Sequence, residues 1–287
     1  MFQKILIPLD GTAHAEHAFH LAQTLAPADD GQLMLLHVLA QARESVSTHD
    51  LATAHRYLSD LHRTAQPTTR KLCTQLAVGD VASVIVDTAT QENVDLLLMT
   101  AEGRLGFGRS ILGGVAERVL RTAPCPMLVS RFPDKIQRVL ITLDGSHLAE
   151  QALPLGLAVA QKLEAKVTLL QVEEGVKVAP SIASKWLERA EAAEERISER
   201  LATDAATYLQ QAATKVGGGV KTAVLPGPVV SSIISYIETN HIDLVVMATH
   251  GFAGLSRWDY GHVTEKIMRG ADTSLLITRP APHQRIA

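Results

Sequence analysis

The strongest constraint on the fold is an internal repeat that runs through the whole 287-residue chain. The segment KILIPLDGTAHAEHA (4–18) aligns without gaps with RVLITLDGSHLAEQA (138–152), so that Asp10 matches Asp144 at an offset of 134 residues. The same offset still relates LMLLHV, near residue 33, to VTLLQV, near residue 167. Repetition of this length and order predicts a duplicated domain.

The second part of the repeat follows at a larger offset. Residues 77–103 match residues 225–251 at an offset of 148, and this offset persists through GGVAERVL and GHVTEKIM. The 14 extra residues of the second copy lie in or beside a charged, alanine-rich stretch from about Ser181 to Lys215. Its apolar positions, which include Ile197 and Leu201, predict an amphipathic helix that covers the second unit.

Each unit alternates short apolar runs with longer helical patterns. Such alternation indicates right-handed βαβ crossovers and an open parallel sheet covered on both faces. We therefore predict an α/β fold of two tandem Rossmann-like domains, residues 1–132 and 136–287, each with a five-stranded parallel sheet flanked by helices. In the first domain we expect strands at about 4–9, 32–38, 71–77, 95–100 and 126–131, and helices that begin near Ala13, Thr48, Asp80 and Gly114.

Composition excludes several classes of protein. A net charge of −3 without a long basic tract argues against a general nucleic-acid or membrane-surface binder. The apolar runs are all shorter than the roughly 20 residues that span a bilayer, so we expect no membrane segment. The cysteines, Cys73 and Cys125, are too few for a disulfide scaffold and suit a reducing compartment. We therefore expect a cytoplasmic protein.

The loops after the first strand of each unit are candidate ligand sites, because open parallel sheets bind ligands at the carboxyl ends of their strands. Asp10 and Asp144 stand in these loops. Each carboxylate could accept a hydrogen bond from a ribose hydroxyl or an adenine amino group. Alternatively, each could cap the following helix, since aspartate accepts from free backbone N–H groups there.

The loops after the fourth strands are rich in glycine. The first runs from Thr100 through Gly103 to Gly113, and the second from Ala248 through Gly251 to Gly261. A glycine loop that enters a helix can present N–H groups and the helix dipole to a phosphate. Glycines also form ordinary turns, and neither loop has the pattern of a P-loop or a dinucleotide fingerprint.

These residues resemble the universal stress protein family over nearly the whole chain. Typical features are the first strand that ends in Leu-Asp-Gly-Ser/Thr, the Val-Ala-Glu-Arg-Val-Leu helix and the last strand APCPMLVSR (123–131). The arrangement resembles tandem members such as the E-type proteins. The resemblance implies adenine-nucleotide alpha hydrolase-like domains whose last strands pair. PMLVS (126–130) and SLLIT (274–278) should then meet within this chain as an intramolecular pseudo-dimer.

ATP-binding members of that family carry Gly-x2-Gly-x9-Gly-Ser/Thr, and this chain keeps the spacing but not the chemistry. In the first unit Thr100 replaces the leading glycine, Glu102 the usual histidine and Gly114 the hydroxyl residue after Gly113. Glu102 would place a carboxylate near the triphosphate, which is an unfavourable like-charge contact.

The second unit differs from the motif in other positions. His250 keeps the usual histidine, Ala248 replaces the leading glycine, and His262 stands where the hydroxyl residue is usual. His262 could donate to a phosphate in its place. We expect any phosphate site of this unit to involve His250, Gly251, Gly261 and His262, and that of the first unit to involve Gly103, Gly113 and Gly114.

The residues that would contact the base and the sugar match the family pattern more closely than those of the phosphate motif do. Asp10 and Val38 in the first unit, and Asp144 and Val172 in the second, match the family's base- and sugar-contacting positions. Pro8, which would lie beside the base, is threonine in the second copy. The resemblance therefore implies that ATP or AMP could bind in one or both units, with weakened contacts to the phosphates.

Other constellations favour structural roles. His14, His17 and His20 follow one helical stripe and could bind zinc, but a solvated helix face is the simpler interpretation and no metal is predicted. Cys125 is interpreted as buried packing rather than a nucleophile. Glu117 should complement the dipole of its helix or pair with Arg118, and Glu265 should do the same or pair with Lys266.

We therefore predict a universal stress response protein that is not an enzyme and whose degenerate pockets could bind ATP or AMP in one or both domains. The alternative is a nucleotide-free interaction scaffold of the same fold. A nucleotide hydrolase is less favoured, because no metal-binding carboxylate pair stands near a glycine loop. A homodimer is possible at this stage, and no protein partner can be named.

Overall fold

The computed structural model describes residues 2–27, 29–40, 45–65, 71–101, 113–131, 136–174, 184–249 and 262–279, without the side chains of 184–193 and 262. Residues 132–135, at the boundary between the two predicted domains, lie outside these ranges.

The first half of the chain alternates strands and helices, as the repeat predicts. The strands and helices begin within one residue of the expected positions. Its elements are β1 (Lys4–Leu9), α1 (Ala13–Leu25), β2 (Gln32–Leu39), α2 (Thr48–Thr64), β3 (Lys71–Val78), α3 (Val81–Gln91), β4 (Leu96–Thr100), α4 (Gly114–Thr122) and β5 (Met127–Ser130).

The second half repeats this order, except that its first helix is divided. Its elements are β6 (Arg138–Thr142), α5 (His147–Glu150), α6 (Ala152–Lys162), β7 (Lys166–Glu173), α7 (Ser184–Lys215), β8 (Lys221–Pro226), α8 (Val229–Asn240), β9 (Leu244–Ala248), α9 (His262–Gly270) and β10 (Ser274–Thr278).

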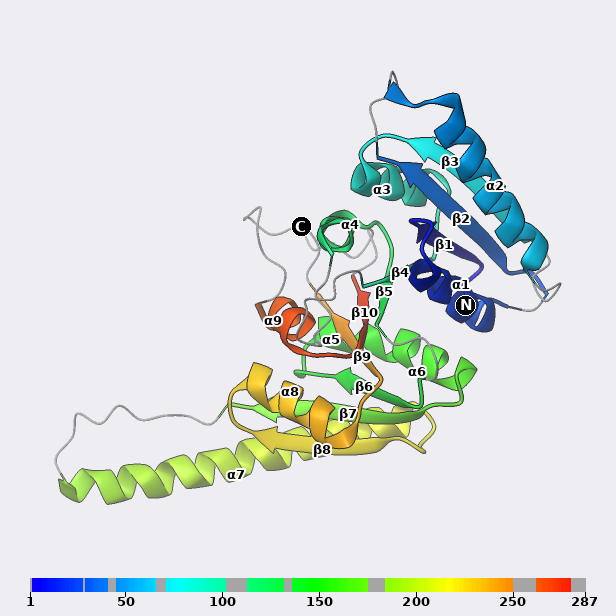
Figure 1. The fold of residues 1–287 in the computed structure, drawn as a ribbon. Coiled ribbons are helices and arrows are strands. Elements are labelled where there is room, and N and C mark those ends of the chain that lie inside the picture. The colour runs from blue at the N-terminus through cyan, green and yellow to red at the C-terminus, as the bar shows by residue number, and fades with distance from the viewer. Residues whose placement is uncertain are drawn as a thin grey trace.

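The two halves form one ten-stranded sheet in the order β3-β2-β1-β4-β5-β10-β9-β6-β7-β8 (Figure 1). Strands within each half are parallel, whereas β5 and β10 pair antiparallel at the centre. Leu128 lies opposite Leu276, flanked by the Val129–Leu275 and Met127–Ile277 pairs. The predicted pairing of the last strands is therefore confirmed. It joins the two five-stranded sheets that the repeat predicts into one ten-stranded sheet.

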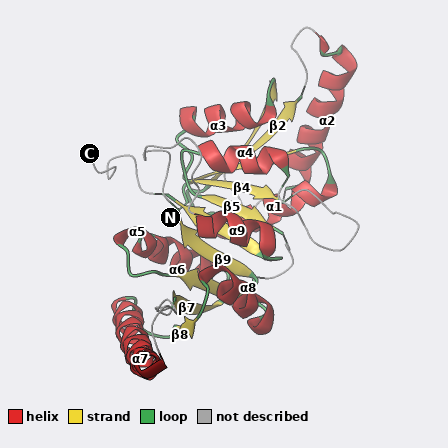
Figure 2. Ribbon diagram, turned by 90° about the vertical axis from the view of Figure 1, so that its left-hand side faces the viewer, coloured by secondary structure: helices red, strands yellow, loops and turns green. Residues whose placement is uncertain are grey.

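Helices cover both faces of this sheet (Figure 2). Buried residues of α1, α2, α6 and α7 form one apolar layer with alternate strand residues such as Ile5 and Ile7. Those of α3, α4, α8 and α9 form the other layer, with residues such as Leu6 and Leu97. Each layer runs through both halves of the chain, so the central pairing makes two continuous aliphatic cores.

Helix α7 contains 32 residues, against 17 in the corresponding α2, and so takes up much of the insertion in the second copy. Its carboxyl-terminal half covers the sheet as expected, with Ala205, Leu209 and Ala212 buried. Its amino-terminal half instead extends away from the body of the domain (Figure 1). Ile197, expected to cover the second unit, is 43% exposed, because the helix is longer than the sheet surface beneath it.

Two equivalent arginines join the halves across the centre. The Arg131 guanidinium, with its side chain only 1% exposed, donates to the Met268 carbonyl at 2.6 Å. Arg279 donates to the Leu120 and Ala123 carbonyls. Each arginine follows the last strand of one half and binds the end of the last helix of the other, where the helix leaves carbonyls without intrahelical partners.

Glu117 and Glu265 lie in the first turns of α4 and α9, as the helix-dipole alternative expects, but the expected partners Arg118 and Lys266 are wrong. Glu117 binds Arg121 at 2.7 Å and, across the two halves, Arg269 at 3.3 Å. Glu265 binds Arg269 at 3.2 Å. Residues four apart share one helix face, whereas the adjacent Arg118 points elsewhere and binds Asp80, the N-cap residue of α3.

Leu128→Ala should lower the free energy of unfolding by about 2–5 kcal/mol, because it leaves a cavity at the centre of the sheet. The matched control, Ile197→Ala on the exposed part of α7, should change it by less than about 0.5 kcal/mol. Urea denaturation followed by circular dichroism measures both. Equal effects of the two changes would contradict the central role of the β5–β10 pairing.

Candidate functional site

The strand register brings the predicted base- and sugar-contacting residues together in both halves. Leu9 lies opposite His37 on β1 and β2, so Asp10 and Val38 follow at the same edge of the sheet. In the second half the Leu143 amide donates to the Leu170 carbonyl at 2.8 Å, so Asp144 and Val172 also emerge together. Both aspartates are exposed, and both valines are half-buried.

Pro8 lies on β1 opposite Leu36 and is half-buried. Its counterpart Thr142 lies opposite Leu170 on β7. The two residues therefore occupy equivalent places, just before the loops that carry the aspartates. The missing N–H of a proline leaves this position of β1 without a donor to its neighbour.

Asp10 does not itself cap α1. Its Oδ1 accepts from the Thr12 amide at 2.9 Å and from the Thr12 hydroxyl at 2.7 Å. Thr12 is the N-cap residue, and its Oγ1 accepts from the Ala15 amide at 3.2 Å. The capping interpretation of Asp10 is therefore wrong in detail, because the aspartate orients the residue that caps the helix.

The second half repeats this arrangement with serine in place of threonine. Asp144 Oδ1 accepts from the Ser146 amide at 2.9 Å. The Ser146 hydroxyl accepts from the Ala149 amide at 3.1 Å at the start of α5. Both aspartates thus lie on loops that their own hydrogen bonds hold, and a ligand would meet a preformed carboxylate.

The amino end of α4 is the place where the phosphates are predicted to bind in the first half. Gly113 is the N-cap residue and makes no side-chain capping bond, and space is open around the Cα of Gly114. The first amides of α4 are thus uncapped by any side chain of the described residues, as an anion site needs. Gly113 has a φ of −63°, so its backbone does not itself require glycine.

Several predicted site residues cannot be placed. Gly103, His250, Gly251 and Gly261 lie outside the described residues, as does Glu102. His262 is the first residue of α9, but its side chain is not described. The phosphate side of both pockets therefore remains a sequence prediction.

A tyrosine that the sequence did not single out lies near each aspartate. Tyr57 comes from α2 and Tyr208 from α7; each side chain is half-buried, and its hydroxyl is enclosed beside the carboxylate of Glu16 or Glu150. Burial raises the pKa of Tyr57, and the carboxylates of Glu16 and Asp10 raise it further. Both tyrosines should therefore be neutral at physiological pH.

In the second half, the pKa of Tyr208 is raised for the same reasons. Burial raises the pKa of Tyr208, and the nearby carboxylates of Glu150 and Asp144 add to the effect. The glutamates are equivalent in the repeat, but the tyrosines stand 151 positions apart and match neither offset. Alignment alone therefore hides this cluster, because the longer α7 shifts its tyrosine.

The two clusters differ on the neighbouring strand. In the first half the His37 ring packs edge-on against Tyr57, with 5.7 Å between ring centroids, and His37 Nδ1 lies 2.8 Å from the Leu9 carbonyl. The equivalent residue of the second half, Gln171, donates instead to Glu173 at 2.5 Å. The two halves thus present different side chains behind similar loops.

The histidine stripe on α1 is solvated at two of its three positions. His14 and His20 are exposed and His17 is half-buried. His14 Nε2 lies 3.2 Å from the Ala101 carbonyl at the end of β4. In the part of the chain that the structure describes, no three histidine, cysteine, aspartate or glutamate side chains are grouped so that they could hold a metal ion.

Cys125 is a packing residue. Burial, followed by the nearby carboxylate of Asp95, raises the pKa of its thiol to about 12. The nucleophilic thiolate is therefore scarce at neutral pH. Cys73, in contrast, is exposed on β3.

The fold and its strand-end loops define a tandem α/β protein with equivalent candidate sites in its two halves. The model of the universal stress protein family matches residues 1–131 and again residues 135–279. The chain therefore belongs to the universal stress protein family.

Known relatives support the tandem arrangement. A universal stress protein of Mycolicibacterium smegmatis is 23% identical over 297 aligned positions, which cover 96% of this chain and 97% of the relative. A universal stress protein of Methanocaldococcus jannaschii is 29% identical over 145 positions, which cover 47% of this chain and 85% of the relative.

Solved structures share the fold over nearly the whole chain. A universal stress protein from Archaeoglobus fulgidus matches with a TM-score of 0.68 at 16% identity, covering 97% of this chain and 99% of its own. A functionally unknown protein from Pseudomonas aeruginosa matches with a TM-score of 0.71 at 19% identity, covering 98% and 93%. None of the described helices is long and apolar enough to cross a membrane.

The two thiols should react at very different rates. Cys73 should react with a disulfide reagent such as DTNB in the native protein, whereas Cys125 should react only after unfolding, because it is buried and protonated. Thiol titration with and without denaturant, with Cys73→Ser as the control, measures this. Rapid modification of Cys125 in the folded Cys73→Ser variant would contradict its role in packing.

Proposed function

We propose that this chain is a non-catalytic stress-response protein that binds ATP or AMP at the carboxyl edge of its sheet. The observation that carries the proposal is the placement of Asp10 beside Val38, repeated by Asp144 beside Val172. Each pair offers a carboxylate for sugar or base donors next to an apolar contact surface, which is how small-molecule sites combine orientation with burial.

The loop hydrogen bonds add to this support. Thr12 and Ser146 hold the two carboxylates in place, so little conformational entropy is lost when a ligand binds. No side chain of the described residues caps the amino end of α4, so its backbone N–H groups are available as donors at the same edge of the sheet. We expect contacts to base and sugar to supply most of the affinity, and we favour the second half because a carboxylate at Glu102 would repel phosphate in the first.

The second candidate function is a nucleotide-free interaction scaffold. Its support is that Asp10 already uses Oδ1 for two bonds to Thr12, and that both phosphate motifs have lost their hydroxyl residue. In this case the duplicated fold would be retained for its surface. The two candidates differ in one measurable property, the binding of adenine nucleotide.

Calorimetric titration of the full chain with ATP, ADP and AMP separates the candidates. We expect binding, weakened about tenfold or more by Asp144→Ala, since a hydrogen bond to a charged group contributes about 1.5–3 kcal/mol. Asp243→Ala is unsuitable as a control because Asp243 accepts from the Arg138 amide. The exposed Glu238→Ala is the better control. Absence of binding at millimolar nucleotide would refute the first function and favour the scaffold.

Glu102→Gln should strengthen ATP binding by the first half more than AMP binding. Removing the carboxylate abolishes a like-charge contact that grows with the number of phosphates, and we expect about a tenfold gain for ATP. The measurement is best made in the Asp144→Ala background, with Glu238→Gln as the charge-matched control. Equal gains for ATP and AMP would show that Glu102 does not face the phosphates.

A further inference from the structure

The two outer strands of the ten-stranded sheet, β3 and β8, differ in how well they could pair with another strand. At the end of β3 the Gly79 amide donates to the Leu39 carbonyl at 3.1 Å, towards the interior of the sheet. Backbone groups of a strand point alternately to its two sides. The amides of Leu72, Thr74, Leu76 and Val78 therefore point outward, and no described strand pairs with them.

The outer edge of β8 offers fewer donors. The Gly227 amide donates to the Glu173 carbonyl at 3.0 Å, so Thr222, Val224 and Pro226 face outward by the same alternation. Pro226 is the repeat equivalent of Val78 and has no N–H group. Proline on an edge strand discourages pairing, so β3 is the better edge for a further strand.

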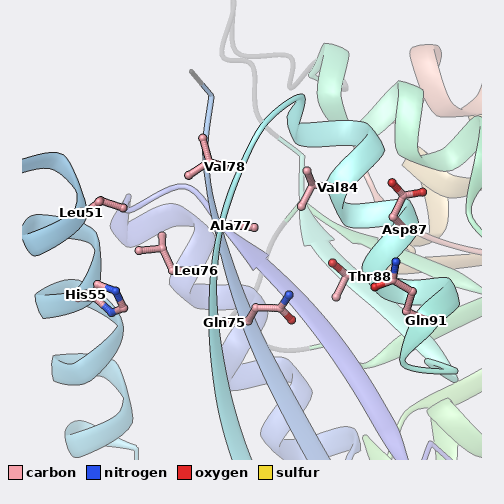
Figure 3. A pocket seen from close by; sticks show the side chains of 10 residues that line it. All are labelled: Leu51, His55, Gln75, Leu76, Ala77, Val78, Val84, Asp87, Thr88 and Gln91. Carbon is pink, nitrogen blue, oxygen red and sulfur yellow. The ribbon is translucent and has the colours of Figure 1, made fainter. Parts of the chain in front are cut away.

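A groove of about 540 Å³ runs beside β3, between α2 and α3 (Figure 3). Its α3 wall carries Asp87, Thr88 and Gln91. In the described part of the chain these side chains make no hydrogen bond or ion pair, although Thr88 is only 4% exposed. The neighbouring Thr90, in contrast, donates to the Val86 carbonyl at 2.8 Å. The groove thus presents a carboxylate and further acceptors to whatever lies along β3.

We propose that a second copy of this chain occupies the β3 edge, with the two β3 strands antiparallel and Thr74 opposite its own copy. This register places Leu72 opposite Leu76, two residues whose backbone amides point out of the sheet edge. It also places Lys71 opposite Ala77, which lines the groove together with Asp87. The exposed Lys71 ammonium of each copy then reaches the Asp87 carboxylate of the other, and the two-fold axis makes this ion pair twice.

Charge complementarity selects the second copy and this register. Lys71 is the first residue of β3, and Asp87 stands beside its last residues, so an antiparallel copy brings opposite charges together at both ends. The chain already extends its sheet in this way once, through antiparallel β5 and β10. After β3 is paired, the remaining edges are β8 strands with Pro226, so assembly ends at a closed dimer.

Charge exchange tests the dimer in the full-length chain. Native mass spectrometry and sedimentation should show a dimer of the wild type at micromolar concentration. Lys71→Asp and Asp87→Lys should each weaken it at least about tenfold, since like charges then face each other, and the double variant should restore it. The control is Lys221→Asp, at the first residue of the other edge strand, which should leave the dimer unchanged.

Three outcomes would overturn the proposal. A wild-type monomer throughout the micromolar range excludes the second copy as the occupant. A double variant that stays monomeric while circular dichroism shows both single variants folded excludes the Lys71–Asp87 pairing. Equal weakening by Lys221→Asp places the contact at β8 instead.

A disulfide tests the register independently of charge. In the proposed pairing residue 75 of one copy lies directly opposite Cys73 of the other, in a non-hydrogen-bonded pair with Cα atoms about 4.5 Å apart, within the range for a disulfide. Gln75→Cys should therefore form a covalent dimer on mild oxidation. The Gln75→Cys/Cys73→Ser variant should form much less. Equal cross-linking of the two variants overturns this register.

Discussion

The antiparallel pairing of β5 with β10 is the interaction on which the rest of the structure depends. Leu128 and Leu276, which are equivalent in the repeat, lie opposite each other and mark the local two-fold axis of the chain. The pairing removes two exposed edges that would otherwise invite association. It also makes both apolar layers continuous, and the reciprocal bonds of Arg131 and Arg279 then connect each half to the last helix of the other.

The two halves keep one scaffold but present different chemistry. Asp10 and Asp144 are held by equivalent loop hydrogen bonds, and a half-buried tyrosine lies near each. Behind these residues, His37 in one half stands where Gln171 stands in the other. Duplication within one chain permits such divergence, because each half can change its site while the central pairing is preserved.

Much of the fold follows from local patterns. Short apolar runs bounded by polar residues locate the strands, and Thr12, Ser47 and Asp80 cap the helices close to where the sequence suggests. The co-location of Asp10 and Val38 follows from parallel topology alone. Side-chain partners are less predictable. Glu117 pairs with Arg121 and Arg269 rather than Arg118, because helix geometry and the opposite half determine which cation lies nearby.

The sequence by itself determined the duplication, the alternation of strands and helices and the identity of the candidate loops, because these depend on residue order and short-range periodicity. Only the tertiary structure decided that Thr12 rather than Asp10 caps its helix, that Tyr57 and Tyr208 lie near equivalent carboxylates, and that no described strand covers β3 while Pro226 limits the β8 edge. These features join residues far apart in the chain, and no local pattern specifies which distant groups packing will bring together.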